Sequence, residues 1–180
     1  MIDTFIANAS PDELRAAVRG LLSSSSPTVA SAFTDVARRR LAQTTAAPMP
    51  PPESLFVRRS GGSTSELRSV LARARMLYGV GLGFASLKVL ALPVRAAAGL
   101  RCEPGSELEQ LFAEIDADVG QALQSAREEL DSGRAGNLQA ARAALDELKS
   151  AVREGQAATA AWGEAYPFER AAASLEFWKL

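Results

Sequence analysis

The chain of 180 residues contains no histidine and a single cysteine, Cys102. Histidine is the usual general base and metal ligand near neutral pH. Its absence excludes Ser-His-Asp and Cys-His hydrolases, and zinc sites built on histidine or on paired cysteines. One cysteine forms no internal disulfide, which favours a reducing compartment. We therefore expect a cytoplasmic or nuclear protein, and the sequence indicates no catalytic, cofactor-binding or metal-ligating residue.

The net charge and the aromatic content of the chain are also low. Aromatic residues make up 6% of the chain and the net charge is −1, which gives no global attraction to nucleic acid or to anionic membranes. The charges are nonetheless unevenly distributed, because residues 1–75 carry an excess of arginine and residues 76–180 an excess of acids. Two interpretations stay open: two faces of one bundle attract each other, or the basic part binds an acidic partner.

Amphipathic helical periodicity is the strongest positive signal. Apolar residues recur at spacings of three and four over residues 10–22, 27–41, 63–78, 106–130, 137–162 and 168–178. Ser-x-x-Glu sequences at Ser10, Ser63 and Ser106 predict capping boxes at helix N-termini. No segment shows the alternation of a strand. The sequence predicts an all-α, antiparallel bundle of five to six helices, with residues 1–180 as a single domain.

A segment rich in proline, glycine and serine separates the second and third predicted helices. Residues 43–63 contain four prolines and two adjacent glycines, a composition that is incompatible with a helix and typical of an extended linker or long loop. Within it, Leu55, Phe56 and Val57 are expected to dock onto the bundle.

The glycine-rich segment from Tyr78 to Phe84 invites comparison with phosphate-binding loops. The dinucleotide fingerprint requires glycine at the place held by Phe84, and a P-loop requires a Gly-Lys pair that is absent here. Gly79 and Gly83 are four residues apart, so on one continuous helix they would share a face and let another helix approach closely. The alternative is a ligand cavity beside Tyr78, Gly79, Gly83 and Phe84.

Residues 76–94 are almost entirely apolar and raise the possibility of a membrane span. Lys88 near the middle and Pro93 near the end argue against it, because a charge within a span is costly. A buried central helix explains the segment better.

Two charged clusters have both a functional and a structural interpretation. Glu114 and Asp118 are four residues apart, which suits either a metal or acid–base pair or a solvated helix face. Arg38–Arg40, with Arg58 and Arg59, would form a nucleic-acid patch, but no base-reading polar residues accompany them. We therefore expect no nucleic-acid binding.

Aromatic residues gather near the C-terminus. They close one end of the core or form an exposed partner surface, for which tryptophan and tyrosine are typical. The candidate surface comprises Trp162, Tyr166, Phe168 and Trp178.

Three segments carry a resemblance to a known group: LRAAVRGLLSSSSPTVASAF (14–33), RARMLYGVGLGFASL (73–87) and WGEAYPFERAAASLEFWK (162–179). Together they resemble an uncharacterised all-helical protein family of filamentous fungi. That group has no known activity, so the resemblance implies a helical fold and no site residues. The N-terminal helices alone are similar to those of proteasome-tethering proteins, and this similarity carries no function over.

These observations favour a non-catalytic interaction or adaptor protein, monomeric or weakly dimeric. Its partner would be a protein, not nucleic acid or a membrane, and no cofactor is implied. One alternative is a small-molecule or lipid-binding bundle with a cavity near Gly79–Gly83. Another is a histidine-free enzyme that uses carboxylate, arginine and Tyr78 chemistry, and the sequence leaves the question of enzymatic activity open.

Overall fold

The computed structural model describes residues 2–43, 48–57, 62–163 and 165–178. Within these residues the chain has eight α helices, one short 3₁₀ helix and no strand, and 76% of it is helical. The all-α prediction is confirmed, whereas the number of helices exceeds the five to six expected. One additional helix is α1 (Ile2–Asn8). The other arises because a turn at residues 80–82 separates the helix predicted over residues 63–78 from the apolar helix expected over residues 76–94.

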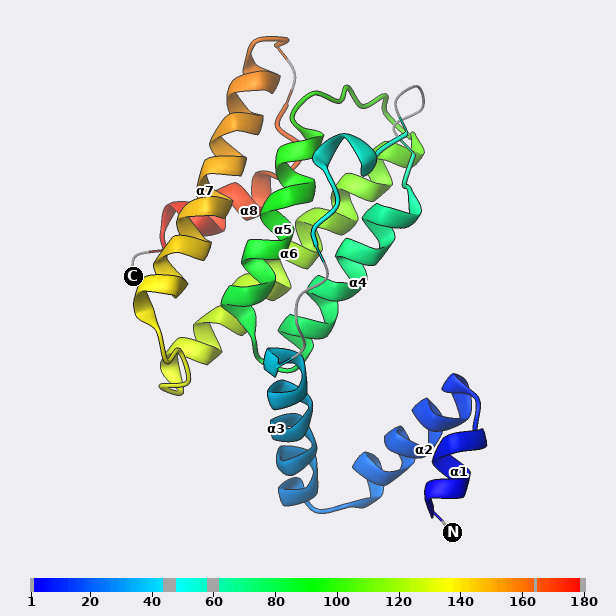
Figure 1. Ribbon diagram of the computed structural model, residues 1–180. Helices are drawn as coiled ribbons and strands as arrows, with labels where there is room; N and C mark the ends of the chain where they lie inside the picture. The colour runs from blue at the N-terminus through cyan, green and yellow to red at the C-terminus, as the bar shows by residue number, and fades with distance from the viewer. Residues whose placement is uncertain (1, 44–47, 58–61, 164, 179–180) are drawn as a thin grey trace. The chain divides into compact units, whose positions relative to one another are not determined.

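The chain separates into two compact units with the boundary between residues 44 and 45, inside the predicted linker. The first unit contains α1, α2 (Pro11–Ser24) and α3 (Pro27–Gln43), drawn in blue in Figure 1. The predicted capping box starts α2: the Ser10 hydroxyl accepts a hydrogen bond from the Glu13 amide, and the Glu13 carboxylate accepts one from the Ser10 amide.

Residues 44–47 and 58–61 of the predicted loop lie outside the described residues, and with them Arg58 and Arg59 of the candidate basic patch. The described part contains the 3₁₀ helix η1 (Pro52–Ser54). Leu55 and Phe56 are buried as expected, but the prediction is wrong for Val57, which is 44% exposed. Phe56 pairs with Ser63 in an isolated antiparallel bridge.

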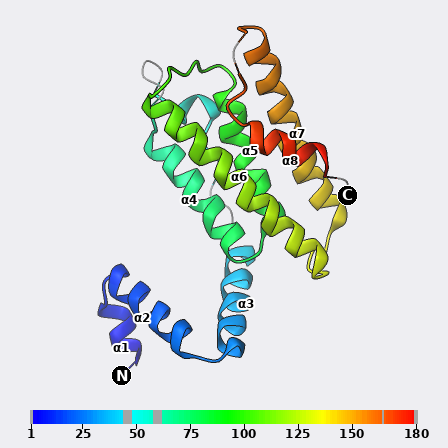
Figure 2. The same ribbon diagram turned by 180° about the vertical axis from the view of Figure 1, so that it is seen from behind.

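The second unit is built around α5 (Gly83–Ala97), which packs against η1, α4 (Ser65–Gly79), α6 (Glu107–Asp131) and α7 (Leu138–Ala160). Successive helices from α4 to α7 alternate in direction, and α8 (Glu169–Glu176) packs on α6 and α7 (Figures 1 and 2). α5 occupies the centre of the unit because its sequence is almost entirely apolar. Only Lys88 and a few small or peripheral residues of this helix lie outside the core.

Local side chains cap the N-termini of several helices, whereas the N-cap residues of α5 and α8 provide no side-chain cap. The side chains of Ser106 and Asn137 accept hydrogen bonds from the amides three residues on and start α6 and α7 near the predicted positions. The capping box predicted at Ser106 is incomplete, because the Glu109 carboxylate accepts a hydrogen bond from the Gly105 amide instead of the Ser106 amide. The predicted cap at Ser63 is wrong, because Thr64 caps α4 and Ser63 is held in the bridge. Pro93 does not end its helix, since α5 continues to Ala97. No described helix has the length and apolar character that crossing a membrane requires.

Candidate functional site

The glycine-rich segment forms a turn between α4 and α5 instead of one continuous helix. Gly79 ends α4 and is exposed, whereas Gly83 begins α5 and is buried. Gly81 between them has φ +77°, a conformation that favours glycine. The predicted shared face of Gly79 and Gly83 is therefore wrong, but the predicted close approach is real at Gly83. A Cβ built there would lie 2.0 Å from the backbone nitrogen of Ala126 on α6.

Phe84, a member of the predicted glycine-segment site, lines a cavity. This cavity of about 400 Å³ lies between the start of α5 and the start of α7, with Lys88, Glu129 and Glu147 among its lining residues. The Phe84 amide donates to the Glu129 carboxylate at 3.2 Å. The backbone of α6 packs directly against Gly83 and leaves no space there for a ligand. At this residue the structure therefore shows the close helix contact and not the ligand cavity.

Two of the four candidate surface aromatics belong to the core, so the partner-surface interpretation is wrong for them. Phe168 and Trp178 are only 1% and 7% exposed. The Phe168 ring meets Phe112 and Tyr166 edge to face, with centroids 5.4 and 5.5 Å apart. These contacts fasten the C-terminal segment to α6, which is the structural interpretation offered by the sequence.

The other two candidate aromatics, Trp162 and Tyr166, are half-buried. The guanidinium of Arg101 stacks over the Trp162 ring, 4.9 Å from its centroid. Phe177, another aromatic residue of the C-terminal group, is 82% exposed.

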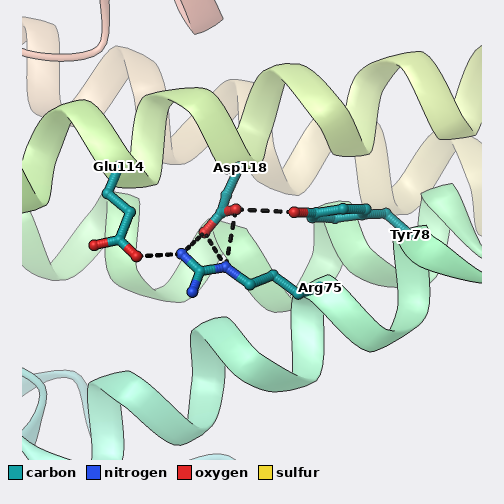
Figure 3. Close-up of polar contacts among 4 residues, drawn as sticks. All are labelled: Arg75, Tyr78, Glu114 and Asp118. Carbon is teal, nitrogen blue, oxygen red and sulfur yellow. Dashed lines mark hydrogen bonds and ion pairs between the residues drawn. The ribbon is translucent and has the colours of Figure 1, made fainter. Parts of the chain in front are cut away.

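A cluster of four polar residues joins α4 to α6 (Figure 3). The Arg75 Nε donates to both carboxylate oxygens of Asp118, at 3.1 and 3.0 Å, and Nη2 donates to Oδ2 at 2.7 Å. Nη2 also pairs with Glu114, and the Tyr78 hydroxyl donates to Asp118 Oδ1 at 3.0 Å. Arg75 and Tyr78 are one turn apart on α4, and the two acids are one turn apart on α6, so each pair projects from one helix face.

The electrostatics of this cluster are those of a permanent cross-link. The hydrogen bonds with Asp118 raise the pKa of Arg75 above its ordinary value, so the guanidinium stays charged. Burial raises the pKa of Tyr78, and its hydrogen bond to Asp118 adds to the effect. The phenol therefore keeps its proton and holds the carboxylate in place.

This arrangement leaves the Asp118 carboxylate little capacity for other chemistry. Four hydrogen bonds from Arg75 and Tyr78 already use its two oxygens. Asp118 is 5% exposed, so the solvated-face interpretation fails for it. Across the described ranges no group of three or more His, Cys, Asp or Glu residues is placed to hold a metal ion. The cluster thus connects two helices and does not resemble a reactive centre.

Asp116, on the same helix, performs a different structural task. It is 4% exposed, and its Oδ1 accepts a hydrogen bond from the Ala171 amide at 2.9 Å. Its Oδ2 accepts one from Arg170 Nε, also at 2.9 Å. The N-cap residue of α8, Phe168, provides no side-chain cap. Asp116 supplies the missing acceptor and places negative charge at the N-terminus of α8.

Two cavities of about 680 Å³ each flank Tyr166. Burial raises the pKa of its phenol, and the charge of Asp116 adds to the shift. The Tyr166 hydroxyl has no hydrogen-bond partner among the described residues and is itself inaccessible to solvent. It lies against α7, where a Cβ built at Gly155 would be 3.2 Å away. The hydroxyl therefore does not reach a ligand in either cavity.

The N-terminal unit presents the most unusual surface. None of residues 2–43 is buried, and no pair among α1, α2 and α3 packs extensively within this described range. Large apolar side chains remain more than a third exposed, although such side chains normally contribute to a core. They are Ile2, Phe5, Ile6, Leu21, Val29, Phe33 and Val36.

A shallow groove lies between α2 and α3. It encloses about 350 Å³ and has an apolar floor formed by Leu14, Val18 and Phe33. Arg15 and Arg19 are the two charged residues in its lining. Arg15 pairs with the exposed Asp12 at 2.7 Å, whereas no carboxylate of the described residues lies within ion-pair distance of Arg19.

Comparison with known proteins gave no matching family model, no match among curated proteins and no match among solved structures. The resemblance to helical proteins of filamentous fungi stays a prediction. The interpretation of function rests on the residues of this chain.

The sequence predicted α2 and α3 of the N-terminal unit but not α1 or the groove. The apolar stripe of α2 was visible, and so was the excess of arginine in the first 75 residues. The missing information was that nothing in the unit covers that stripe. A useful signal would have been its small size, because three short helices cannot enclose a core of their own.

Proposed function

We propose that this protein is a non-catalytic interaction protein whose N-terminal helices, residues 2–43, bind a helical segment of another protein. The observation that carries the proposal is the complete absence of buried residues in this described range, next to seven exposed large apolar side chains. Exposed apolar surface of this extent is typical of a binding site.

The second unit is stably packed, which is consistent with this role. Its core is continuous from Leu55 to Trp178, and polar cross-links fix its helices to one another. Charged side chains in this unit are engaged in such links, as in the pairing of Arg75 with Asp118 and of Arg170 with Asp116. This division of labour, with a packed unit and an uncovered amphipathic unit, suits an adaptor.

The form of the N-terminal surface favours a helix as the occupant. Its apolar residues follow helical spacing on α2 and α3, and none of the described residues there forms a strand whose edge would accept an extended peptide. Helices recognise such surfaces by inserting apolar residues at i, i+3 or i+4 and i+7. The cytoplasm or nucleus remains the expected compartment, and the small-molecule and enzyme alternatives remain hypotheses.

The proposal is tested by changing the exposed apolar residues and measuring partner binding. The triple variant Leu21→Asp/Phe33→Asp/Val36→Asp is expected to lose at least about tenfold in affinity, because each large apolar side chain contributes about 1.5–3 kcal/mol when it is fully buried. Partners captured by the intact chain are identified, purified and recombined with it, so that the dissociation constant is measured on a defined complex.

The matched control changes exposed apolar residues of the second unit, Met76→Asp/Leu138→Asp, which are 53% and 50% exposed in the native chain. This variant should bind the recombined partner as the native chain does. Equal binding by the triple variant would contradict the proposal. So would a dimer of the purified chain that does not dissociate on dilution in sedimentation experiments, because a second copy would then occupy the surface.

A further inference from the structure

We propose that the groove between α2 and α3 selects an amphipathic helix that carries acidic residues beside its apolar stripe; this inference rests on the proposed function and names the chemistry of the partner. The groove combines an apolar floor with a rim of one charge sign. Leu14, Val18 and Phe33 form the floor, and Arg15 and Arg19 form the rim.

The positions of the two arginines follow from helix geometry. Arg15 and Arg19 are four residues apart on α2, so both project from one face, next to Leu14 and Val18. No acidic residue contributes to the groove lining. A helix seated on the floor would therefore bring its flanking side chains within reach of two guanidinium groups, which form strong paired hydrogen bonds with carboxylates.

The competing internal interaction is weak. Asp12 pairs with Arg15, but the side chains are 92% and 64% exposed, and such an exposed pair contributes about 0–1 kcal/mol. Arg19 has no ion-pair partner in the described residues. Both cations are thus able to meet carboxylates of a partner without giving up a strong existing bond.

A membrane surface fits this groove less well than a helix does. An interfacial helix inserts one convex apolar face, whereas this floor is concave and built from two helices. Residues 2–43 also contain five arginines and four carboxylates, so the unit as a whole has little attraction for anionic lipid.

The test uses the intact chain and two synthetic 18-residue helical peptides. Both carry the same leucine stripe at i, i+3, i+4 and i+7, with glutamate flanking it in one peptide and lysine in the other. Fluorescence anisotropy gives each dissociation constant at low and high salt. The glutamate peptide should bind about tenfold more tightly at low salt, and the difference should shrink as salt screens the ion pairs.

Two variants assign the preference to the groove. Arg15→Glu/Arg19→Glu should reverse the order of the two peptides, whereas Leu14→Asp/Val18→Asp should weaken both. A control with the same charge change on an exposed face of α7, Arg142→Glu/Arg153→Glu, should leave the preference unchanged. Circular dichroism checks that all variants retain the native helix content.

The outcomes separate this inference from the proposed function. Equal binding of both peptides would overturn the acidic preference and leave helix binding intact. Failure of both peptides to bind would overturn the helix groove itself. Binding to phosphatidylserine vesicles, with no binding of either peptide, would overturn it in favour of a membrane surface.

Discussion

Replacing Gly83 with alanine is expected to destabilise the second unit by about 3 kcal/mol, the upper end of the usual effect of overpacking a core. The added Cβ would lie 2.0 Å from the Ala126 nitrogen and 2.3 Å from its Cα. Both are backbone atoms, so no side-chain rotation relieves the overlap. Helices α5 and α6 must separate, and the contacts that surround this crossing are lost with them.

Gly120→Ala is the matched control, because Gly120 lies on α6 and no atom would come within 4 Å of its Cβ. That substitution should stabilise the protein by up to about 1 kcal/mol through helix propensity. Urea unfolding followed by tryptophan fluorescence measures both, since Trp162 and Trp178 lie in the second unit. Equal stability of the two variants would show that α5 and α6 do not cross at Gly83.

Asp118→Ala is expected to reduce the free energy of unfolding by about 2–3 kcal/mol, in line with the loss of hydrogen bonds to a charged group. The buried carboxylate joins Arg75 and Tyr78 on α4 to α6. The Arg75 side chain is 40% exposed, so water replaces part of the lost interaction and the effect stays below that of a fully buried pair.

The control is Glu114→Ala, which removes the more exposed partner of the same guanidinium. The Glu114 side chain is 49% exposed, and its loss should reduce stability by no more than about 1 kcal/mol. If Glu114→Ala and Asp118→Ala had equal effects, the burial of Asp118 would have no energetic consequence and our account of the cluster would be wrong.

The Asp118→Ala variant should also change the pKa of Tyr78. Burial is the main cause of the raised Tyr78 pKa and the Asp118 hydrogen bond is the second, so Asp118→Ala should lower that pKa while leaving it above the ordinary value. A Tyr166→Phe background leaves Tyr78 as the only phenol to titrate. Because the folded-state pKa is raised, the stability associated with Tyr78 is complete below pH 10 and is lost as the pH rises above it.

Features that depend on neighbouring residues were predictable from the sequence. The caps at Ser10, Ser106 and Asn137 require only the amides two or three positions ahead, and the structure shows all three. Apolar periodicity likewise identified the long helices. The cap at Ser63 failed because the pairing of Ser63 with Phe56, a contact outside the helix, determined where α4 begins.

Features that depend on distant residues were not predictable. The partners Arg75 and Asp118 are 43 positions apart, and Asp116 caps a helix 55 positions away. Asp118 had been interpreted as part of either a metal or acid–base pair or a solvated helix face, because the sequence does not show that Arg75 and Tyr78 lie opposite it. The glycine segment failed for a related reason: spacing indicated a close approach but did not reveal that a turn precedes Gly83.

The N-terminal unit shows a third reason why the sequence alone does not determine the candidate site. α2 and α3 were predictable, but isolated helices of this length have marginal stability in water without packing. Whether a stripe is covered depends on the rest of the fold or on a partner. In the described residues 2–43 no side chain is buried, so we expect these helices to gain most of their stability on binding.

Amide hydrogen exchange of the intact, partner-free chain tests this central claim most directly, at concentrations where sedimentation shows a monomer. We predict that α2 and α3 exchange with protection near zero to about 1 kcal/mol, while α5 and α6 approach the global unfolding free energy of about 5–15 kcal/mol. Protection of α2 and α3 equal to that of α6 in the monomer would show that the N-terminal helices already have a core, which would contradict their role as a binding surface.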